Sequence, residues 1–241
     1  MKKAPQEYSL HSAFTMIELV FVIVIIGILA TVIIPSTRTN PLREAAIQLV
    51  SHIRYTQHLA MVDDKFDVSD ANWYKNRWQI NFVNSSTITN PGVTYTIFSD
   101  WKNSSTANPD EEEIAKNPLN SEKVLSGGHS NLNASFDKSL TSKLNLTQSY
   151  GVTSYDLDDL DSSLANGCSG ARITFDYLGR PIKGKLGTSS GNITAYESDN
   201  LLQRPCYVTL SNSSDSVIIK IHPESGYACI LKDNNPSSKC L

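Results

Sequence analysis

Four cysteines are the residues of this sequence best suited to covalent chemistry: Cys168, Cys206, Cys229 and Cys240. Four cysteines allow three pairings. Cys229 and Cys240 enclose a short segment that contains turn-forming Asn and Pro residues, so this pairing has the lowest closure entropy. Its stabilisation would be on the order of 3 kcal/mol. A disulfide between Cys168 and Cys206 then follows by elimination.

Zinc coordination is the alternative use of the cysteines. The sequence contains no C-x-x-C pair, and His129 and His222 lack the spacing of zinc ligands. We therefore expect two disulfides and no metal centre.

An acidic group, Asp156, Asp158, Asp159 and Asp161, offers oxygen atoms that could bind calcium. The glycine and terminal glutamate of an EF-hand are missing, so solvated or helix-capping aspartates are the simpler interpretation. The sequence also lacks the G-x-S-x-G, P-loop, H-E-x-x-H and G-x-G-x-x-G motifs. With no catalytic constellation, we expect neither an enzyme nor a cofactor.

Composition and its distribution along the chain limit the class of protein. A length of 241 residues suits one domain with an appendage or two small domains, and a formal net charge of -3 argues against a general nucleic-acid binder. No charged residue occurs from Leu19 to Ile34, whereas the chain beyond Lys65 is polar and rich in Ser, Asn and Thr. This asymmetry disfavours a plain soluble enzyme.

The apolar stretch has the length of a membrane span. From Phe14 to Ile34 the only charge is Glu18, and a helix over this run would be about 31 Å long, close to the ~30 Å hydrocarbon layer. Lys2 and Lys3 favour retention of the N-terminus in the cytoplasm. The rest of the chain would then lie outside the cytoplasm, where disulfides persist.

Glu18 is the unusual residue of this stretch. A carboxylate in an apolar span costs on the order of 2.5–3.5 kcal/mol, so it usually has a partner. If the chain is cut after Ala13, Phe14 gains a free amine, and Glu18 of one copy could neutralise the amine of a neighbouring copy. The alternative is a glutamate that extends to the interface from near the end of an ordinary anchor.

The segment AFTMIELVFVIVIIGILA, followed by Pro35, closely resembles the N-terminal signature of type IV prepilins and type II secretion pseudopilins. In that family a membrane peptidase removes a short basic leader and N-methylates the new first residue. The resemblance implies a leader over residues 1–13, cleavage between Ala13 and Phe14, and methylation of Phe14. It also implies an assembly role for Glu18 and a helix kink at Pro35. Ala13 departs from the family, which usually has glycine before the cut.

The fold class expected for this chain is α+β. A long N-terminal membrane-spanning helix over residues 14–35 continues as an amphipathic helix over 36–64, whose apolar positions recur at three- and four-residue spacing: Leu42, Ala45, Ala46, Leu49, Ile53, Thr56 and Ala60. His52 and His58 are six residues apart and are expected at the surface or boundary of this helix. The C-terminal half of the long helix should pack on an antiparallel sheet, as in pilins.

Residues 65–241 are expected to form a β-rich extracytoplasmic head. Runs rich in β-branched and aromatic residues predict strands at Trp78–Val83, Val93–Phe98, Arg172–Tyr177, Tyr207–Leu210, Val217–Ile221 and Tyr227–Leu231. The polar stretch over about 100–165 has no clear periodicity and is expected to be a long surface insertion with short helices.

Two segments of the head resemble the C-terminal sheet of the minor pseudopilin H and minor pilin T subgroup. There, an F-x-x-x-G-R strand and turn is followed by a hydrophobic strand and a short Ser/Thr-Gly segment. The corresponding residues here are Phe175, Gly179 and Arg180, then Ser225 and Gly226. The alternative for Arg180 is a surface turn residue with a solvated guanidinium.

These observations predict a structural subunit: a minor pilin or pseudopilin of a type IV pilus or type II secretion pseudopilus. Its expected place is the bacterial inner membrane, as a single-pass protein with a periplasmic head, and then the fibre. The implied partners are other pilins or pseudopilins, the prepilin peptidase, the inner-membrane assembly platform and membrane lipid. Lys183 and Lys185 beside Arg180 leave nucleic acid as a further candidate partner. The competing interpretation is a periplasmic enzyme or binding protein with a plain N-terminal anchor.

Overall fold

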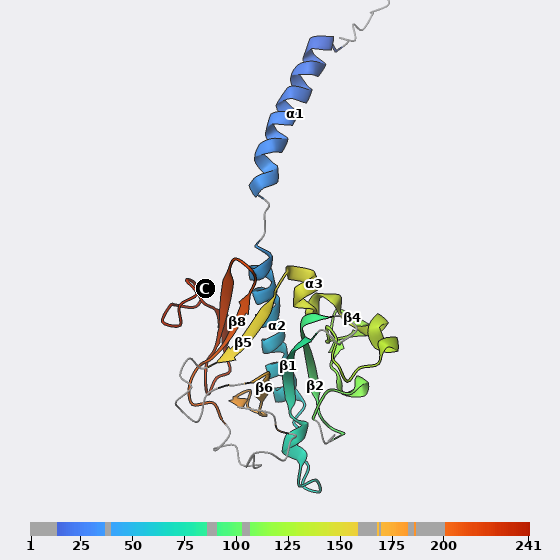
Figure 1. Cartoon of the computed structure of the whole chain (residues 1–241), viewed down its shortest axis with the longest axis vertical. Coiled ribbons are helices and arrows are strands. Elements are labelled where there is room, and N and C mark those ends of the chain that lie inside the picture. Colours follow the sequence, from blue (N-terminus) through green and yellow to red (C-terminus); the bar gives the residue numbers. More distant parts are fainter. Residues whose placement is uncertain are drawn as a thin grey trace, which may run out of the picture. The chain divides into compact units, whose positions relative to one another are not determined.

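The computed structural model describes residues 14–36, 40–85, 91–102, 107–158, 168, 170–182, 186 and 201–241 (Figure 1). The chain divides into two compact units, Met1–Asn40 and Pro41–Leu241. In the part of the first unit that the structure describes there is one helix, and the second unit is an α+β head with antiparallel sheets. The predicted α+β class is therefore confirmed.

Helix α1 (Met16–Ser36) is the described element of the first unit. The helix is almost entirely apolar apart from Glu18 in its first turn, and Pro35 lies in its last turn. The large apolar side chains from Phe14 to Leu29 are between 40% and 85% exposed. Among the described residues, no helix combines the length and hydropathy needed to cross a membrane.

Helix α2 (Pro41–Val62) begins the head. Pro41 occupies the first helical position, where its fixed φ suits the helix and its missing N–H is not needed. The predicted apolar stripe is confirmed, because these residues are all buried: Leu42, Ala45, Ala46, Leu49, Ile53, Thr56 and Ala60. The helix thus presents one continuous face to the core.

Two four-stranded antiparallel sheets form the head. The first has the order β2 (Gly92–Ser99), β1 (Trp78–Ser85), β6 (Arg172–Phe175) and β7 (Pro181–Ile182). The second has the order β10 (Ala228–Ile230), β9 (Ser216–Ile221), β8 (Cys206–Ser211) and β5 (Ser154–Asp158). All six predicted strands are present. A short hairpin, β3 (Lys116–Asn117) and β4 (Asn120–Val124), stands apart from both sheets.

The core lies between α2 and the two sheets. Strand β1 alternates, so that Ile80 and Phe82 belong to this core while Gln79 and Asn81 face the other way. Strands β2, β6, β8 and β9 contribute in the same manner, and α2 contacts both sheets. One helix therefore joins the two sheets into a single unit.

Residues 107–158 are built into the head more deeply than a surface insertion would be. They contain short 3-10 turns at Glu111–Glu113, Ala134–Ser139 and Ser142–Leu144, the helix α3 (Leu146–Tyr150) and the edge strand β5. Leu125, Leu144 and Leu146 are fully buried. A further 3-10 turn, Trp73–Asn76, precedes β1. The sequence did not predict these buried contacts, because isolated leucines in a polar stretch produce no apolar periodicity.

Candidate functional site

Thr15 and Glu18 form a reciprocal cap at the start of α1. The backbone N–H of Glu18 donates to Thr15 Oγ1 (3.3 Å), and the backbone N–H of Thr15 donates to Glu18 Oε2 (3.4 Å). This is a capping box, which satisfies two amide donors that the first helical turn leaves without partners. Phe14 immediately precedes it and is 77% exposed. Ala13, the other side of the predicted cleavage junction, lies outside the described residues.

The head motif predicted from the sequence is brought together against α2. Gln57 Nε2 donates to the carbonyl oxygens of Gly179 and Ser225, both at 2.8 Å. Gly226 approaches so closely that a Cβ there would lie 2.3 Å from the Gly179 carbonyl oxygen and 3.2 Å from the Phe175 ring. Two turns distant in sequence, β6–β7 and β9–β10, therefore meet on one helical side chain.

Arg180 is held within this motif. Its Nε lies 2.6 Å from Asp176 Oδ2, and its backbone N–H donates to Asp176 Oδ1 at 2.7 Å. Asp176 is completely buried, and its carboxylate also accepts the N–H of Leu178. The guanidinium is thus engaged in organising the turn, in place of the solvated alternative. Lys183 and Lys185 lie outside the described residues.

The two predicted disulfides are confirmed: Cys168–Cys206 and Cys229–Cys240. Cys168 and Cys206 are both buried, whereas Cys229 is buried and Cys240 is exposed. The first disulfide ties the segment before β6 to the start of β8. The second joins β10 to the C-terminal end of the chain.

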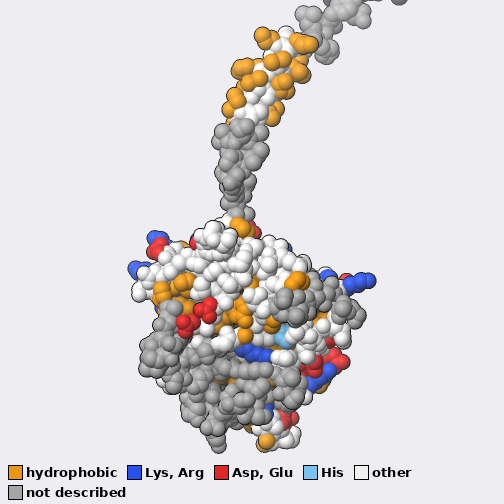
Figure 2. Space-filling model, viewed as in Figure 1, with side chains coloured by type: hydrophobic (Ala, Val, Ile, Leu, Met, Phe, Trp, Pro, Cys, Tyr) orange, Lys and Arg blue, Asp and Glu red, His pale blue; other side chains and the backbone are white. Residues whose placement is uncertain are grey.

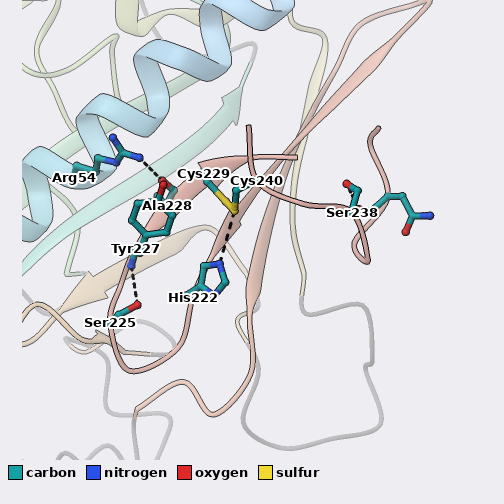
Figure 3. Close-up of a disulfide and its surroundings, with 9 residues drawn as sticks. Arg54, His222, Ser225, Tyr227, Ala228, Cys229, Ser238 and Cys240 are labelled. Carbon is teal, nitrogen blue, oxygen red and sulfur yellow. Dashed lines mark hydrogen bonds between the residues drawn. A yellow bond between two sulfur atoms is a disulfide. The ribbon is translucent and has the colours of Figure 1, made fainter. Parts of the chain in front are cut away.

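His222 lies beside the second disulfide (Figure 3). Its Nε2 is 3.9 Å from Cys240 Sγ, and the ligand atoms of His222, Cys229 and Cys240 all lie within 4.8 Å of one another. Spacing along the chain does not predict this cluster, because His222 directly follows β9, whereas the cysteines lie on β10 and in the C-terminal segment. The pairing of β9 with β10 and the Cys229–Cys240 disulfide bring the three together.

His52 is half-buried, at the boundary of the helix, and has a specific partner. Its Nδ1 lies 2.7 Å from the hydroxyl of Tyr95, which is completely buried and also accepts a hydrogen bond from Gln48 Nε2 at 3.0 Å. Burial lowers the pKa of His52 to about 4 and raises the pKa of Tyr95. The imidazole borders a groove of about 430 Å³ between α2 and residues 117–144.

A polar layer on the outer face of the first sheet was not predicted from the sequence. Arg172, which is buried, donates to Asn81 Oδ1 (3.2 Å), Gln79 Oε1 (3.1 Å) and Asn108 Oδ1 (3.1 Å). Burial lowers the pKa of Arg172 to about 10, and the charge of Asp100 opposes that shift. The guanidinium fastens the segment at 107–108 to the sheet, which is a structural use of the charge.

The acidic group has no assembled geometry among the described residues. Asp156 and Asp158 lie on β5, where they pair with Thr209 and Tyr207 of β8, and Asp159 and Asp161 lie outside the described residues. Asp156 and Asp158 are two residues apart on a strand, so their side chains point to the same face of the sheet.

Comparisons with known proteins place no relative beside this chain. Family models, curated proteins and solved structures give no match. Function must therefore be argued from the residues and the geometry.

Proposed function

We propose that this chain is a minor pilin or pseudopilin, a structural subunit that assembles through its N-terminal helix. The observation that carries the proposal is the exposed apolar surface of α1, where no large side chain from Phe14 to Leu29 is less than 40% exposed (Figure 2). Exposed apolar surface of this extent marks a site of protein or membrane contact. A fibre core made of such helices supplies that contact.

The proposed assembly follows from the chemistry of the helix. The apolar run from Phe14 to Pro35 would lie in the inner membrane until a subunit enters the fibre, where neighbouring helices replace lipid at little cost. The same contact repeated without closure generates a filament. Cleavage after Ala13 would free the amine of Phe14, and Glu18 of a neighbour would be its counter-charge.

The head supports this proposal as a periplasmic domain. Two disulfides suit an oxidising compartment. Helix α2 packs on both sheets, and the close approach of Gly226 to the Gly179 carbonyl brings together the residues that carry the resemblance in the head. The head would then determine which machine or partner the subunit serves.

The mature N-terminus tests the proposal. Mass spectrometry of the protein from the inner membrane and from sheared fibres should find a chain that begins at Phe14 and carries an N-methyl group. The same protein from cells lacking the prepilin peptidase should begin at Met1 and be absent from fibres. An assembled protein that retains Met1 or Lys2 would refute the proposal and favour a plain anchor.

A further inference from the structure

His222, Cys229 and Cys240 have the donor set of a thiophilic metal site. Zinc in proteins is held by thiolate sulfur at about 2.3 Å and imidazole nitrogen at about 2.0–2.1 Å, which in tetrahedral geometry places sulfur and nitrogen about 3.5 Å apart. Cys240 Sγ and His222 Nε2 are already 3.9 Å apart. Figure 3 shows the imidazole pointing at the sulfur atoms from the end of β9.

Backbone pairing holds the two cysteines together independently of their S–S bond. Cys240 forms a β-bridge with Leu231, and on either side of it the N–H of Leu241 donates to Ile230 (2.9 Å) and that of Lys232 to Lys239 (3.2 Å). Strand β10 is in turn paired with β9. Cys229 lies two residues before Leu231, so opening the disulfide would leave the two cysteines as diagonal neighbours on the same face of this short antiparallel pair.

His222 is equally fixed. Its backbone N–H donates to the carbonyl of Tyr227 (2.9 Å), its carbonyl accepts from the N–H of Gly226 (3.0 Å), and its ring packs on that of Tyr227. Lys220 lies opposite Cys229 in the register of β9 and β10.

We propose that the Cys229–Cys240 disulfide is a redox gate over a zinc site formed by His222, Cys229 and Cys240. A thiol or phosphine reductant supplies two electrons, the Sγ–Sγ bond breaks, and two protons from solvent give two thiols. Zn²⁺ then binds two thiolates and the neutral imidazole, releasing two protons. Two thiolate charges balance the ion, and a water completes four-coordination because Cys240 is exposed.

The disulfide and the metal are mutually exclusive states of one site. In the oxidised chain both sulfur atoms belong to the disulfide and neither is a thiolate, so the ion cannot bind. In the reduced chain, bound zinc occupies both sulfurs and opposes reoxidation. The C-terminal segment stays fastened to β10 in both states, which makes the gate a local device that leaves the core unchanged. This inference concerns the head alone and does not depend on the proposed role in a fibre.

The test uses the full chain in detergent. The chain is reduced with a phosphine, separated from the reductant without oxygen, and titrated with Co²⁺ as a visible probe for Zn²⁺. We expect one equivalent to bind, with thiolate-to-cobalt charge transfer and the bands of a tetrahedral site, and Zn²⁺ to displace it. The oxidised chain should show none of these bands. A reduced chain without them, or one whose circular dichroism shows that it has unfolded, would overturn the proposal.

Variants locate the site. His222→Gln keeps both disulfides and should weaken Co²⁺ binding at least about tenfold, whereas His58→Gln, at an exposed histidine of α2, should bind as the original chain does. The double variant Cys229→Ala with Cys240→Ala should lose the charge-transfer band. Cys168→Ala with Cys206→Ala should keep it. Unchanged affinity in His222→Gln, or a band that disappears only with Cys168 and Cys206, would also overturn the proposal.

Discussion

At the scale of the residue, Glu18 has two roles that a single truncation would remove together. In the structure it caps α1 with Thr15. In the proposed fibre its charge would face the amine of a neighbour's Phe14. The capping box accepts Gln as well as Glu, because the amide oxygen can receive the same backbone N–H. The two roles are therefore separable by choice of substitution.

Glu18→Gln should keep the cap and lose the charge, whereas Glu18→Ala should lose both. If charge pairing drives assembly, both variants will insert into the membrane, with the cost of a buried carboxylate removed, and both will be depleted from fibres. The measurement is the fraction of each variant in sheared fibres relative to the membrane pool. Normal incorporation of Glu18→Gln with loss of Glu18→Ala would assign the effect to the cap. Normal incorporation of both would leave Glu18 without an assembly role.

His52 should make the head less stable in acid. Its folded pKa of about 4 lies below the ordinary value of 6.5, so between these pH values the unfolded chain binds more protons. Stability therefore falls as pH decreases from 6.5 to 4, by up to about 3 kcal/mol from this residue. Denaturant unfolding at several pH values should show a smaller loss in His52→Gln than in the original chain. His58→Gln is the control and should leave the difference unchanged; an equal pH dependence in His52→Gln would contradict the assignment.

At the scale of the element, the β6–β7 and β9–β10 turns pack against α2, and this packing explains why the head motif contains glycines. Gly226 has φ of 64° and meets the Gly179 carbonyl, and Gly179 has φ of 78° and lies against Gln57 and Met61. Both the left-handed backbone and the close approach exclude a larger residue. The motif therefore serves to dock the two sheets' turns on the helix.

Gly226→Ala should destabilise the head more than Gly151→Ala. Both glycines have left-handed φ, 64° and 69°, but a Cβ at Gly151 meets nothing within 4 Å. Gly151→Ala should thus lose only the backbone preference, about 1–2 kcal/mol, while Gly226→Ala adds a clash with backbone of about 1–3 kcal/mol. Thermal or denaturant unfolding compares the two. Equal losses would show that the Gly179–Gly226 contact can relax.

The elements with strong periodicity were predictable, and those without it were not. The stripe of α2 and six strands carry their signal in apolar spacing, and the local pair Cys229–Cys240 carries it in loop length. Strand β5 was missed because Ser154–Asp158 is an edge strand of acidic residues around a single buried Leu157. His52 and His222 acquire partners only through long-range packing with Tyr95 and Cys240, which no local spacing encodes.

At the scale of the whole molecule, the chain consists of two compact units, Met1–Asn40 and Pro41–Leu241. The main core cluster of the head begins at Leu42 and, among the described residues, includes no side chain of α1. The disulfides also join residues of the head only. In the proposed fibre subunit, this division would let the helix pass from lipid to the fibre while the head stays folded.

A chain of Pro41–Leu241, exported to the periplasm, should fold as a soluble monomer with both disulfides. Removal of residues 1–40 takes away the apolar surface of α1, whereas the main core cluster of described buried residues starts at Leu42 and is retained. We expect its thermal unfolding midpoint to match that of the head in the full chain in detergent, and non-reducing peptide mapping to recover Cys229 joined to Cys240. A matched control is Leu49→Ala within the same truncated chain, which removes a fully buried side chain of α2 and should lower stability by about 2–5 kcal/mol. A truncated head that aggregates or melts well below the full chain would show that α1 supports the head, and the two-unit organisation would then be wrong.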